Sequence, residues 1–323
     1  MASPDAVAFG IPPVARDTIL SWYAEHGRPL AFRQTRDPYA ILVSEAMAQQ
    51  TQAARAADHW QRFMERFPTI FALAGATPAD VIRAWQGLGY DRRGLALWRT
   101  ARVVVAQHGG RIPTSVAELQ ALPGIGPYTA RAVAALAFGQ PVGAVDVNVR
   151  RVIGRIVAGT AADALTAADM QRLADEAVPP DRPGDWTHAL MDVGATLCRP
   201  RVPRCGTCPA RPWCRLATQA ADGEPGTTLA HALQPPSGAK RARHVRQVPP
   251  TPFTSTNRWL RGRILDRLRA APDGRWVVFG APIGSHELDR VKAAVTAMAA
   301  DGLAELRISA GSGATIRARL PIA

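Results

Sequence analysis

The sequence predicts an all-α catalytic region followed by a small α+β domain. From Arg16 to about Ala220, apolar residues recur at helical spacing, with Pro or Gly at the breaks. Patterns of alternating strands are absent from this region, whereas short strand-like runs occur after residue 252. A segment rich in Pro and Gly, residues 221–252, separates the two parts and predicts a linker.

Helix boundaries are clearest at two places in the first region. Residues 39–67 lie between Pro38 and Pro68, and residues 128–138 lie between Pro127 and Gly139. Pro at the start of a helix and Gly at its end are typical boundary residues. A shorter helix is expected at residues 116–121.

The order of elements in the C-terminal domain, residues 253–323, is that of a winged helix. We predict a basic helix at 257–270, a strand at 276–279, a helix at 285–300 and two strands at 304–309 and 314–320 joined by a turn. The linker before it carries a basic run from Lys240 to Arg246. A small α+β cap without DNA contact is the alternative.

Charge and composition narrow the class of protein. The 323 residues include 39 Lys plus Arg and 26 Asp plus Glu, a net charge of 39 − 26 = +13 that favours a polyanion, above all nucleic acid. A hydrophobic content of 47% predicts a folded soluble protein. With no apolar run of about 18 residues and no basic leader, we expect a cytoplasmic protein without a membrane segment. Its lysines are Lys240 and Lys292, so a lysine amine before residue 240 is excluded.

Four cysteines in one short segment predict a single metal or cluster site. Their spacing is C-x6-C-x2-C-x5-C, at Cys198, Cys205, Cys208 and Cys214. Structural zinc sites usually combine two pairs of closely spaced cysteines, and only one such pair is present. Four thiolates from one compact loop suit an iron–sulfur cluster. Zinc and coincidental thiols are the alternatives that spacing alone leaves open.

Two further motifs carry chemistry. The segment LPGIGPY, residues 122–128, predicts a tight turn in which the backbone of Gly124 and Gly126 is open to a phosphate at a helix N-terminus. It could also be an ordinary turn between helices. In VDVNVRR, residues 145–151, Asp146 stands in an apolar run, where a carboxylate has either a task or a structural partner. Capping of a helix is the simpler explanation.

Together these motifs resemble the endonuclease III and MutY group of DNA glycosylases, in the helix-hairpin-helix superfamily. The segment SEAMAQQTQ, residues 44–52, also matches the MutY pattern SE-x-M-x-QQTQ. The resemblance covers roughly residues 16–215. It implies a six-helix module at about 29–140, an iron–sulfur module from 1–28 and 141–220, and a [4Fe-4S] cluster on the four cysteines.

The resemblance also assigns roles to catalytic residues. Asp146 would be the catalytic aspartate, and Tyr128 stands where glycosylases with lyase activity have a lysine, which implies a monofunctional enzyme. Glu45 would be the general acid that protonates adenine, with Asn148 helping to position the site. On a continuous helix, Glu45 would share a stripe with Gln49 and Gln52, although a solvated polar face is the simpler interpretation.

Residues that contact the base and the duplex follow from the same resemblance. The segment RPLAFR, residues 28–33, resembles the pocket pattern R-x-L-P-W-R, with Ala31 and Phe32 replacing Pro and Trp. The implied base-pocket residues are Arg28, Leu30, Phe32 and His188, the last at a position where Gln or Glu is expected. The implied DNA contacts are Gln50, Thr51, Leu88, Gly89, Tyr90, Leu122, Gly124 and Gly126, of which Leu88 and Tyr90 would wedge the duplex or, alternatively, pack inside the protein.

The function that the resemblance implies is removal of adenine opposite 8-oxoguanine or guanine, in double-stranded DNA, by a monomer acting on the nucleoid. The C-terminal domain departs from the family, because it does not look like the Nudix-like domain expected there. A thymine or uracil mismatch glycosylase is the nearest alternative. A non-catalytic DNA lesion sensor and a zinc-containing regulator built on the winged helix are the others.

Overall fold

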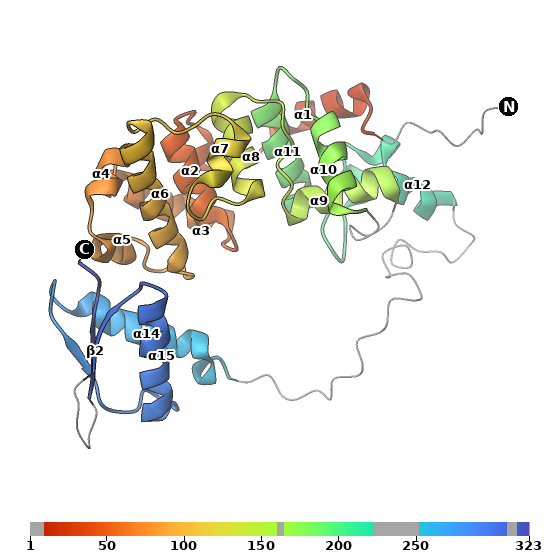
Figure 1. The fold of residues 1–323 in the computed structure, drawn as a ribbon. Helices are drawn as coiled ribbons and strands as arrows, with labels where there is room; N and C mark the ends of the chain where they lie inside the picture. The colour runs from red at the N-terminus through yellow and green to blue at the C-terminus, as the bar shows by residue number, and fades with distance from the viewer. Residues whose placement is uncertain (1–9, 160–164, 223–251, 309–314, 323) are drawn as a thin grey trace. The chain divides into compact units, whose positions relative to one another are not determined.

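The computed structural model describes residues 10–159, 165–222, 252–308 and 315–322. Its described residues up to Asp222 form helices joined by loops, and a small sheet follows in the C-terminal part (Figure 1), which confirms the predicted fold class. The helices of the first part are α1 (Pro13–His26), α2 (Pro38–Ala48), α3 (Ala53–Arg66), α4 (Ile70–Gly75), α5 (Pro78–Ala84), α6 (Arg92–His108), α7 (Val116–Ala121), α8 (Pro127–Phe138), α9 (Val147–Ile153), α10 (Ala167–Glu176), α11 (Pro183–Asp192) and α12 (Arg215–Asp222). Within the described ranges, no helix combines the length and apolarity needed to cross a membrane.

Helices α7 and α8 form the predicted helical hairpin. α8 begins at Pro127, directly after Gly126, and ends at Gly139, whose φ of 63° is left-handed. Pro fits the first helical position because the N–H that it lacks would have no helical partner there. Gly124, in the turn, has a φ of 76°, and a Cβ on it would lie 2.6 Å from the Cβ of Ala96. Both the conformation and the space therefore require glycine in this turn.

The prediction of one helix over residues 39–67 is wrong. The chain forms α2 and α3 there, with a turn at residues 49–52 between them. Gln50 has a φ of 54°, a left-handed conformation that interrupts an α-helix. The guanidinium of Arg93 donates to the carbonyl of Gln49, so a side chain satisfies a backbone acceptor at the end of α2.

The expected stripe of Glu45, Gln49 and Gln52 is wrong for the same reason. α2 ends at Ala48, so only Glu45 of the three lies on this helix. The two glutamines belong to the turn at residues 49–52, where the left-handed φ of Gln50 interrupts the helical conformation.

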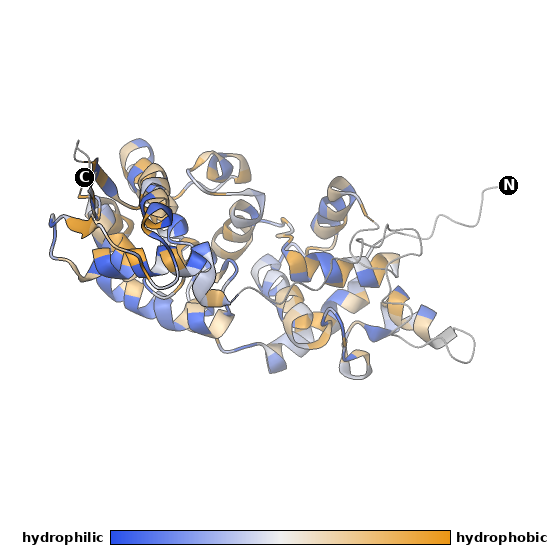
Figure 2. Ribbon diagram, turned by 90° about the horizontal axis from the view of Figure 1, so that it is seen from below, coloured by the Kyte–Doolittle hydropathy of each residue, from blue (hydrophilic) through white to orange (hydrophobic). Residues whose placement is uncertain are grey.

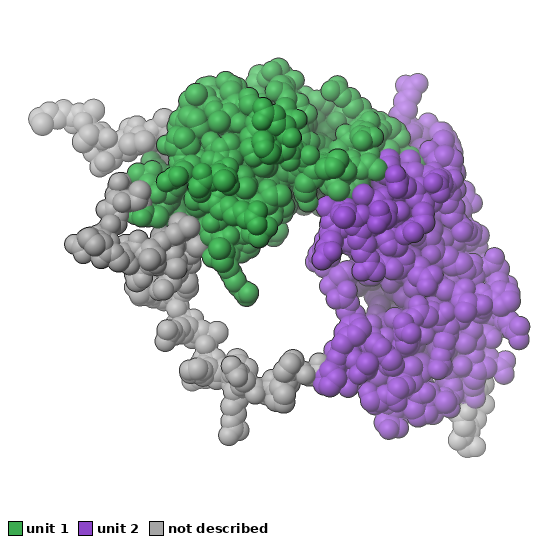
Figure 3. All heavy atoms as spheres, turned by 180° about the vertical axis from the view of Figure 1, so that it is seen from behind, with its two compact units in different colours: residues 1–45, 114–121, 125–239 green, residues 46–113, 122–124, 240–323 purple. Residues whose placement is uncertain are grey.

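The chain divides into two compact units (Figure 3). Unit 1 comprises residues 1–45, 114–121 and 125–239, and unit 2 comprises residues 46–113, 122–124 and 240–323. Hydrophobic and hydrophilic residues are interleaved along the helices (Figure 2), as amphipathic helices require. In unit 1 the apolar faces of α1, α9, α10 and α11 form one core, with Ile19, Ile153, Met170 and Trp186 fully buried in it.

The C-terminal part has the predicted order of helix, strand, helix and hairpin. Its elements are α14 (Asn257–Ala270), β1 (Val277–Phe279), α15 (Leu288–Ala300), β2 (Glu305–Ile308) and β3 (Ile316–Arg319). β3 pairs antiparallel with both other strands, so the strand order is β1-β3-β2. The predicted hairpin turn and most of the predicted linker lie outside the described residues. The apolar core of this part also includes Ala79, Ile82 and Leu95 from α5 and α6 of the same unit.

Candidate active site

A buried acid lies on α2. Residues 39–47 of this helix are all buried, and Glu45 is 6% exposed among them. The hydroxyl of Tyr128, on α8, donates a hydrogen bond to Oε2 of Glu45 at 2.8 Å. The structure therefore brings together two predicted catalytic residues that are 83 positions apart in the sequence.

Burial sets the protonation of this pair. Desolvation raises the pKa of Glu45 to about 7, against the hydrogen bond from Tyr128, which lowers it, while the negative charge of Asp146 raises it further. Burial and the charge of Glu45 raise the pKa of Tyr128 well above its ordinary value. A carboxyl with a pKa near 7 can hold and release a proton at neutral pH, and the phenol stays protonated as a hydrogen-bond donor.

Asp146 is held at the start of α9. Its Oδ1 accepts from the backbone N–H groups of Asn148 (2.8 Å) and Val149 (2.7 Å), as an N-cap does. Its Oδ2 accepts from the side-chain amide of Asn148 at 2.9 Å. Asp146 therefore does cap a helix, as the simpler explanation of this residue expects. Because the donors at a helix N-terminus also stabilise negative charge, the cap keeps an oriented, half-buried carboxylate beside the Glu45–Tyr128 pair.

Arg151 links this carboxylate to the cysteine loop. Its guanidinium donates to Oδ1 of Asn148 at 2.7 Å and to the carbonyl of Gly194 at 2.7 Å. Its Nε donates to the carbonyl of Cys198 at 2.6 Å. The side-chain amide of Asn148 is thus oriented by Arg151 on one side and binds Asp146 on the other.

The base-pocket residues fall into two groups. Phe32 and His188 line a pocket of about 440 Å³, together with Arg33 and Ser44, the neighbour of Glu45 on α2. Burial, with the positive charge of Arg33, lowers the pKa of His188 to about 3. A neutral imidazole at that wall can donate and accept hydrogen bonds at neutral pH.

Arg28 and Leu30, the other two predicted pocket residues, have different surroundings. Leu30 is buried at 9% exposure. Arg28 donates through its backbone N–H (2.8 Å) and Nε (2.7 Å) to Asp192, a fully buried carboxylate on α11.

Sequence reasoning missed Asp192 and its second arginine. Arg33 donates both of its terminal nitrogens to Asp192, at 2.7 and 2.8 Å. Burial favours the neutral acid, but the hydrogen bonds and charge of Arg33, with those of Arg28, hold the pKa of Asp192 below its usual value. The sequence shows only two arginines five positions apart and an aspartate far along the chain. Their pairing becomes evident only in the fold.

The predicted DNA contacts differ in exposure. In unit 2, Tyr90 is 51% exposed, whereas Leu88 is 6% exposed, so a wedging role for Leu88 requires it to leave its buried position. Gln50 is exposed and Thr51 is half-buried in the turn after α2. Gly89, like Gln50 and Tyr90, has a left-handed φ, here 71°. In the hairpin, Leu122 is buried, and both glycines of the motif, Gly124 and Gly126, are exposed to solvent.

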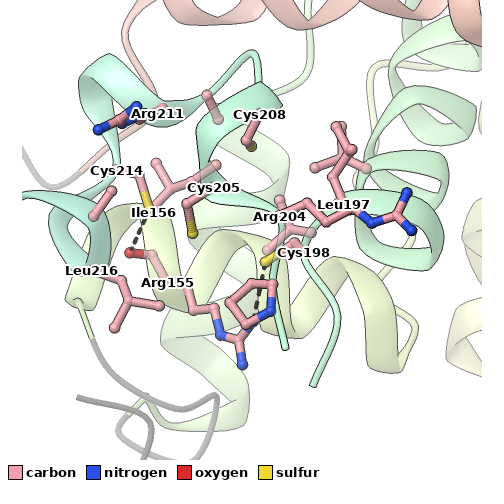
Figure 4. A pocket seen from close by; sticks show the side chains of 15 residues that line it. Arg155, Ile156, Leu197, Cys198, Arg204, Cys205, Cys208, Arg211, Cys214 and Leu216 are labelled. Atoms are coloured by element: carbon pink, nitrogen blue, oxygen red, sulfur yellow. Dashed lines mark hydrogen bonds between the residues drawn. The ribbon is translucent and has the colours of Figure 1, made fainter. Parts of the chain in front are cut away.

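All four cysteines line one cavity in unit 1, and Figure 4 shows their sulfur atoms around it. The cavity has apolar walls, including Val152, Ile156, Val193 and Leu197. In the described part of the chain, no three His, Cys, Asp or Glu side chains meet closely enough to hold one metal ion.

The chemistry of this donor set fits a group held by thiolates. Burial raises the pKa of Cys208 to about 12, so this thiol ionises at neutral pH only when a metal replaces its proton. Arg155, which is 4% exposed, places Nη1 3.4 Å from Sγ of Cys198 and donates to the carbonyls of Arg199 and Pro200 (2.7 and 2.8 Å). This buried guanidinium therefore lies beside one of the four sulfur atoms.

Comparison with known proteins agrees with this arrangement. The description "HhH-GPD superfamily base excision DNA repair protein" matches residues 43–180. The adenine DNA glycosylase of Mycobacterium tuberculosis is 40% identical over 271 residues, 83% of each chain. The structure of a thermostable thymine-DNA glycosylase is similar, with a TM-score of 0.59, 31% identity, and coverage of 63% of this chain and 95% of that one. A trapped endonuclease III–DNA covalent intermediate shares the fold, with a TM-score of 0.55, 21% identity, and coverage of 68% and 99%. The chain therefore belongs to the adenine DNA glycosylase family, within the HhH-GPD superfamily of base excision DNA repair proteins.

Proposed function

We propose that this protein is a monofunctional adenine DNA glycosylase that removes adenine opposite 8-oxoguanine or guanine. The observation that carries the proposal is the buried Glu45, with a pKa of about 7, bonded to Tyr128. The 40% identity to an adenine DNA glycosylase supports the choice of base. Double-stranded DNA is the partner, and a monomer suffices because one chain carries every residue invoked. Such an enzyme would work on the nucleoid.

The acid step falls to Glu45. Breaking the bond between adenine and the sugar leaves negative charge on the base, and a proton delivered to a ring nitrogen makes the base a better leaving group. With its pKa raised to about 7 by burial, Glu45 can hold a proton for this step at neutral pH. Tyr128 holds the carboxyl in one orientation through its hydroxyl.

Asp146 would stabilise the positive charge on the sugar. Positive charge develops on the sugar as the base leaves, and an oriented carboxylate stabilises that charge. The cap of α9 and the amide of Asn148 fix the carboxylate oxygens in advance, so little reorganisation is needed during the reaction. A water molecule then completes the hydrolysis.

Tyr128 is also the reason why no strand cleavage is expected. Lyase chemistry in this superfamily uses a lysine amine at this position, and a phenol cannot form a Schiff base. Lys292 lies on α15 of unit 2, and Lys240 lies outside the described residues. The enzyme would release the base and leave the strand intact.

We propose that Cys198, Cys205, Cys208 and Cys214 hold a [4Fe-4S] cluster. Four thiols around one cavity support a group held by thiolates, and a spacing with only one closely spaced cysteine pair favours the cluster over a structural zinc ion. When bound, the cluster would cross-link the loop at residues 198–214 and so order it. Visible absorbance and iron content measure its presence, and Cys208→Ala should lower both.

The base-pocket and duplex contacts complete the proposal. Phe32 and His188 would form the wall of the adenine pocket, with Arg28 and Leu30 supporting the segment behind it. The exposed glycines of the hairpin, and the loops that carry Gln50 and Tyr90, would contact the duplex.

The decisive experiment is a panel of duplexes assayed with and without alkali. The panel carries A opposite 8-oxoguanine, G and C, and T or U opposite G. We expect breaks at A opposite 8-oxoguanine and G, and only after alkali. Breaks without alkali would contradict the monofunctional assignment, and no base release from any duplex would favour a non-catalytic sensor.

A thymine mismatch glycosylase is the second candidate, favoured by the similarity to the thymine-DNA glycosylase structure. Release of T but not A in the same panel would establish it. A Glu45→Gln variant separates the two mechanisms, since only the removal of adenine needs an acid at this position.

A further inference from the structure

The C-terminal part, residues 252–322, has no task in the proposed reaction, yet it is built onto the helices of unit 2. Leu260, Ile264 and Leu268 of α14 share one buried core with Ala79 and Ile82 of α5. The backbone N–H of Ala79 also donates to the carbonyl of Pro321 at 3.0 Å. A shared core of this kind fixes the position of α14 on α5.

Polar contacts place this attachment beside the loop at residues 85–91, which the proposed function assigns to duplex opening. On one side of the loop, Arg83 pairs with Asp273, and its Nε donates to the carbonyl of Arg269 at 3.4 Å. On the other side, Asp91 pairs with the same Arg269, both side chains being largely buried. Both ends of the loop are therefore held by α14 and the residues that follow it.

Within the loop, the ring of Tyr90 lies close to two guanidinium groups. The guanidinium carbon of Arg258, on α14, is 5.2 Å from the ring centroid, and that of Arg93, on α6, is 5.5 Å away. Arg258 also lies close to Gly89, where an added Cβ would be 3.7 Å from its Nη2. Guanidinium groups at this distance attract the face of an aromatic ring, which limits the orientations open to the exposed Tyr90.

The charges distinguish α14 from α15. Three arginines of α14, Arg261, Arg263 and Arg269, each pair with an aspartate, whereas the guanidinium of Arg258 contacts Tyr90. The exposed residues of α15 are Asp289, Arg290, Ala293, Thr296, Ala297 and Ala300. Together with the half-buried Lys292, these residues carry a net charge of only +1, which is little for a surface that follows phosphates. α15, the helix that a winged helix would place on DNA, is thus the poorer candidate for contact with the duplex.

We propose that Arg258 is a positioning residue for duplex engagement, which holds the ring of Tyr90 and brings a positive charge to the strand that this loop enters. The inference rests on the proposed function of the loop. It assigns the C-terminal part to supporting that loop, with α14 and not α15 toward the duplex.

The test compares single-turnover release of adenine by full-length variants over a range of enzyme concentrations. For Arg258→Ala we expect the concentration that gives half the maximal rate to rise about threefold to tenfold. The rate at saturation should stay within about twofold, because the proposal gives Arg258 no part in the chemical steps of Glu45 and Asp146. Arg258→Lys should recover part of the loss, since an ammonium group keeps the charge.

Arg267→Ala is the matched control. It removes the same charge from an exposed position of the same helix, nine residues later and about half a turn round. This variant should behave like the wild type. If Arg267→Ala and Arg258→Ala weaken engagement equally, general charge and not positioning explains the effect, and the inference is wrong.

A double-mutant cycle with Tyr90→Ala tests the contact itself. If Arg258 acts through Tyr90, the double variant should lose little more than Tyr90→Ala alone, and fully multiplicative losses would overturn the proposal. The fluorescence anisotropy of a labelled duplex measures engagement without base release. A wild type that binds DNA but releases no adenine would therefore refute the proposed function, while an Arg258→Ala variant that binds like the wild type would refute this inference alone.

Discussion

Glu45 and Asp146 are two carboxylates of one site in opposite surroundings. Glu45 lies in the buried stretch of α2, residues 39–47, and accepts one hydrogen bond from a phenol. Asp146 caps a helix and accepts two backbone N–H groups and an amide. Burial favours a protonated acid, whereas several donors at a helix N-terminus favour a carboxylate. The environment, and not the residue type, separates the proposed proton donor from the group proposed to stabilise positive charge.

The largest test of this comparison is Glu45→Gln. An amide of the same shape keeps the acceptor for Tyr128 but cannot deliver a proton. We expect the single-turnover rate of adenine release to fall about 10²- to 10⁴-fold. Glu65→Gln, at an exposed position of α3, should match the wild type. A Glu45→Gln rate within threefold of the wild type would remove the acid from the mechanism.

Asp146→Asn tests whether capping or catalysis is the task of the second carboxylate. Asn is as good an N-cap as Asp, so the variant should fold, while the loss of charge should slow release about 10²- to 10³-fold. Asp169→Asn, near the start of α10, is the control. The measurements are the release rate and the midpoint of thermal unfolding. A fall in the unfolding midpoint with an unchanged rate would mean that Asp146 is only a cap.

The raised pKa of Glu45 predicts a pH dependence of stability. The pKa of Glu45 in the folded protein, about 7, is above its ordinary value of 4.5. Its protonated form therefore contributes stability to the fold, which is fully present below about pH 4.5 and is lost as the pH rises through 7. Glu45→Gln has no such loss. We therefore compare the free energy of unfolding of Glu45→Gln with that of the wild type at each pH. The difference, variant minus wild type, should be about 1–3 kcal/mol larger at pH 8 than at pH 4. Denaturant unfolding at both values measures this, and an equal difference at the two would contradict the burial argument.

The smallest expected effect is a shift of the pH–rate profile in Tyr128→Phe. The wild-type rate should fall above a pH of about 7, as Glu45 loses its proton. The phenol hydrogen bond lowers the pKa of Glu45, so its removal should move this fall to higher pH. Tyr39→Phe makes the same change at a buried tyrosine of α2 and should leave the profile in place. A shift to lower pH in Tyr128→Phe would mean that the phenol stabilises the protonated acid.

Local motifs were predictable where neighbours along the chain decide the conformation. Pro127 and Gly139 delimit α8 as expected, and Gly124 has the left-handed φ that its turn requires. The turn that divides residues 39–67 was not predictable, because its left-handed residue, Gln50, is not the Gly or Asn that typically marks this conformation. The carbonyl of the preceding residue, Gln49, accepts a hydrogen bond from Arg93, which lies on α6.

The ion pairs of Asp192 were hidden for a related reason. Its partners Arg28 and Arg33 are more than 150 positions away, and any of the many arginines could have paired with it. The same holds for Arg258 and Tyr90, which only the packing of α14 on α5 brings together.

By itself, the sequence determined the class of fold, the set of four cysteines and the absence of a lysine from the catalytic region, because composition, spacing and helix-boundary residues are local properties. The tertiary structure alone decided how deeply Glu45 is buried, which donors hold Asp146 and which loop the C-terminal part supports. Desolvation and charge pairing depend on residues that meet only after folding, and they set the proton affinities on which the proposed chemistry depends.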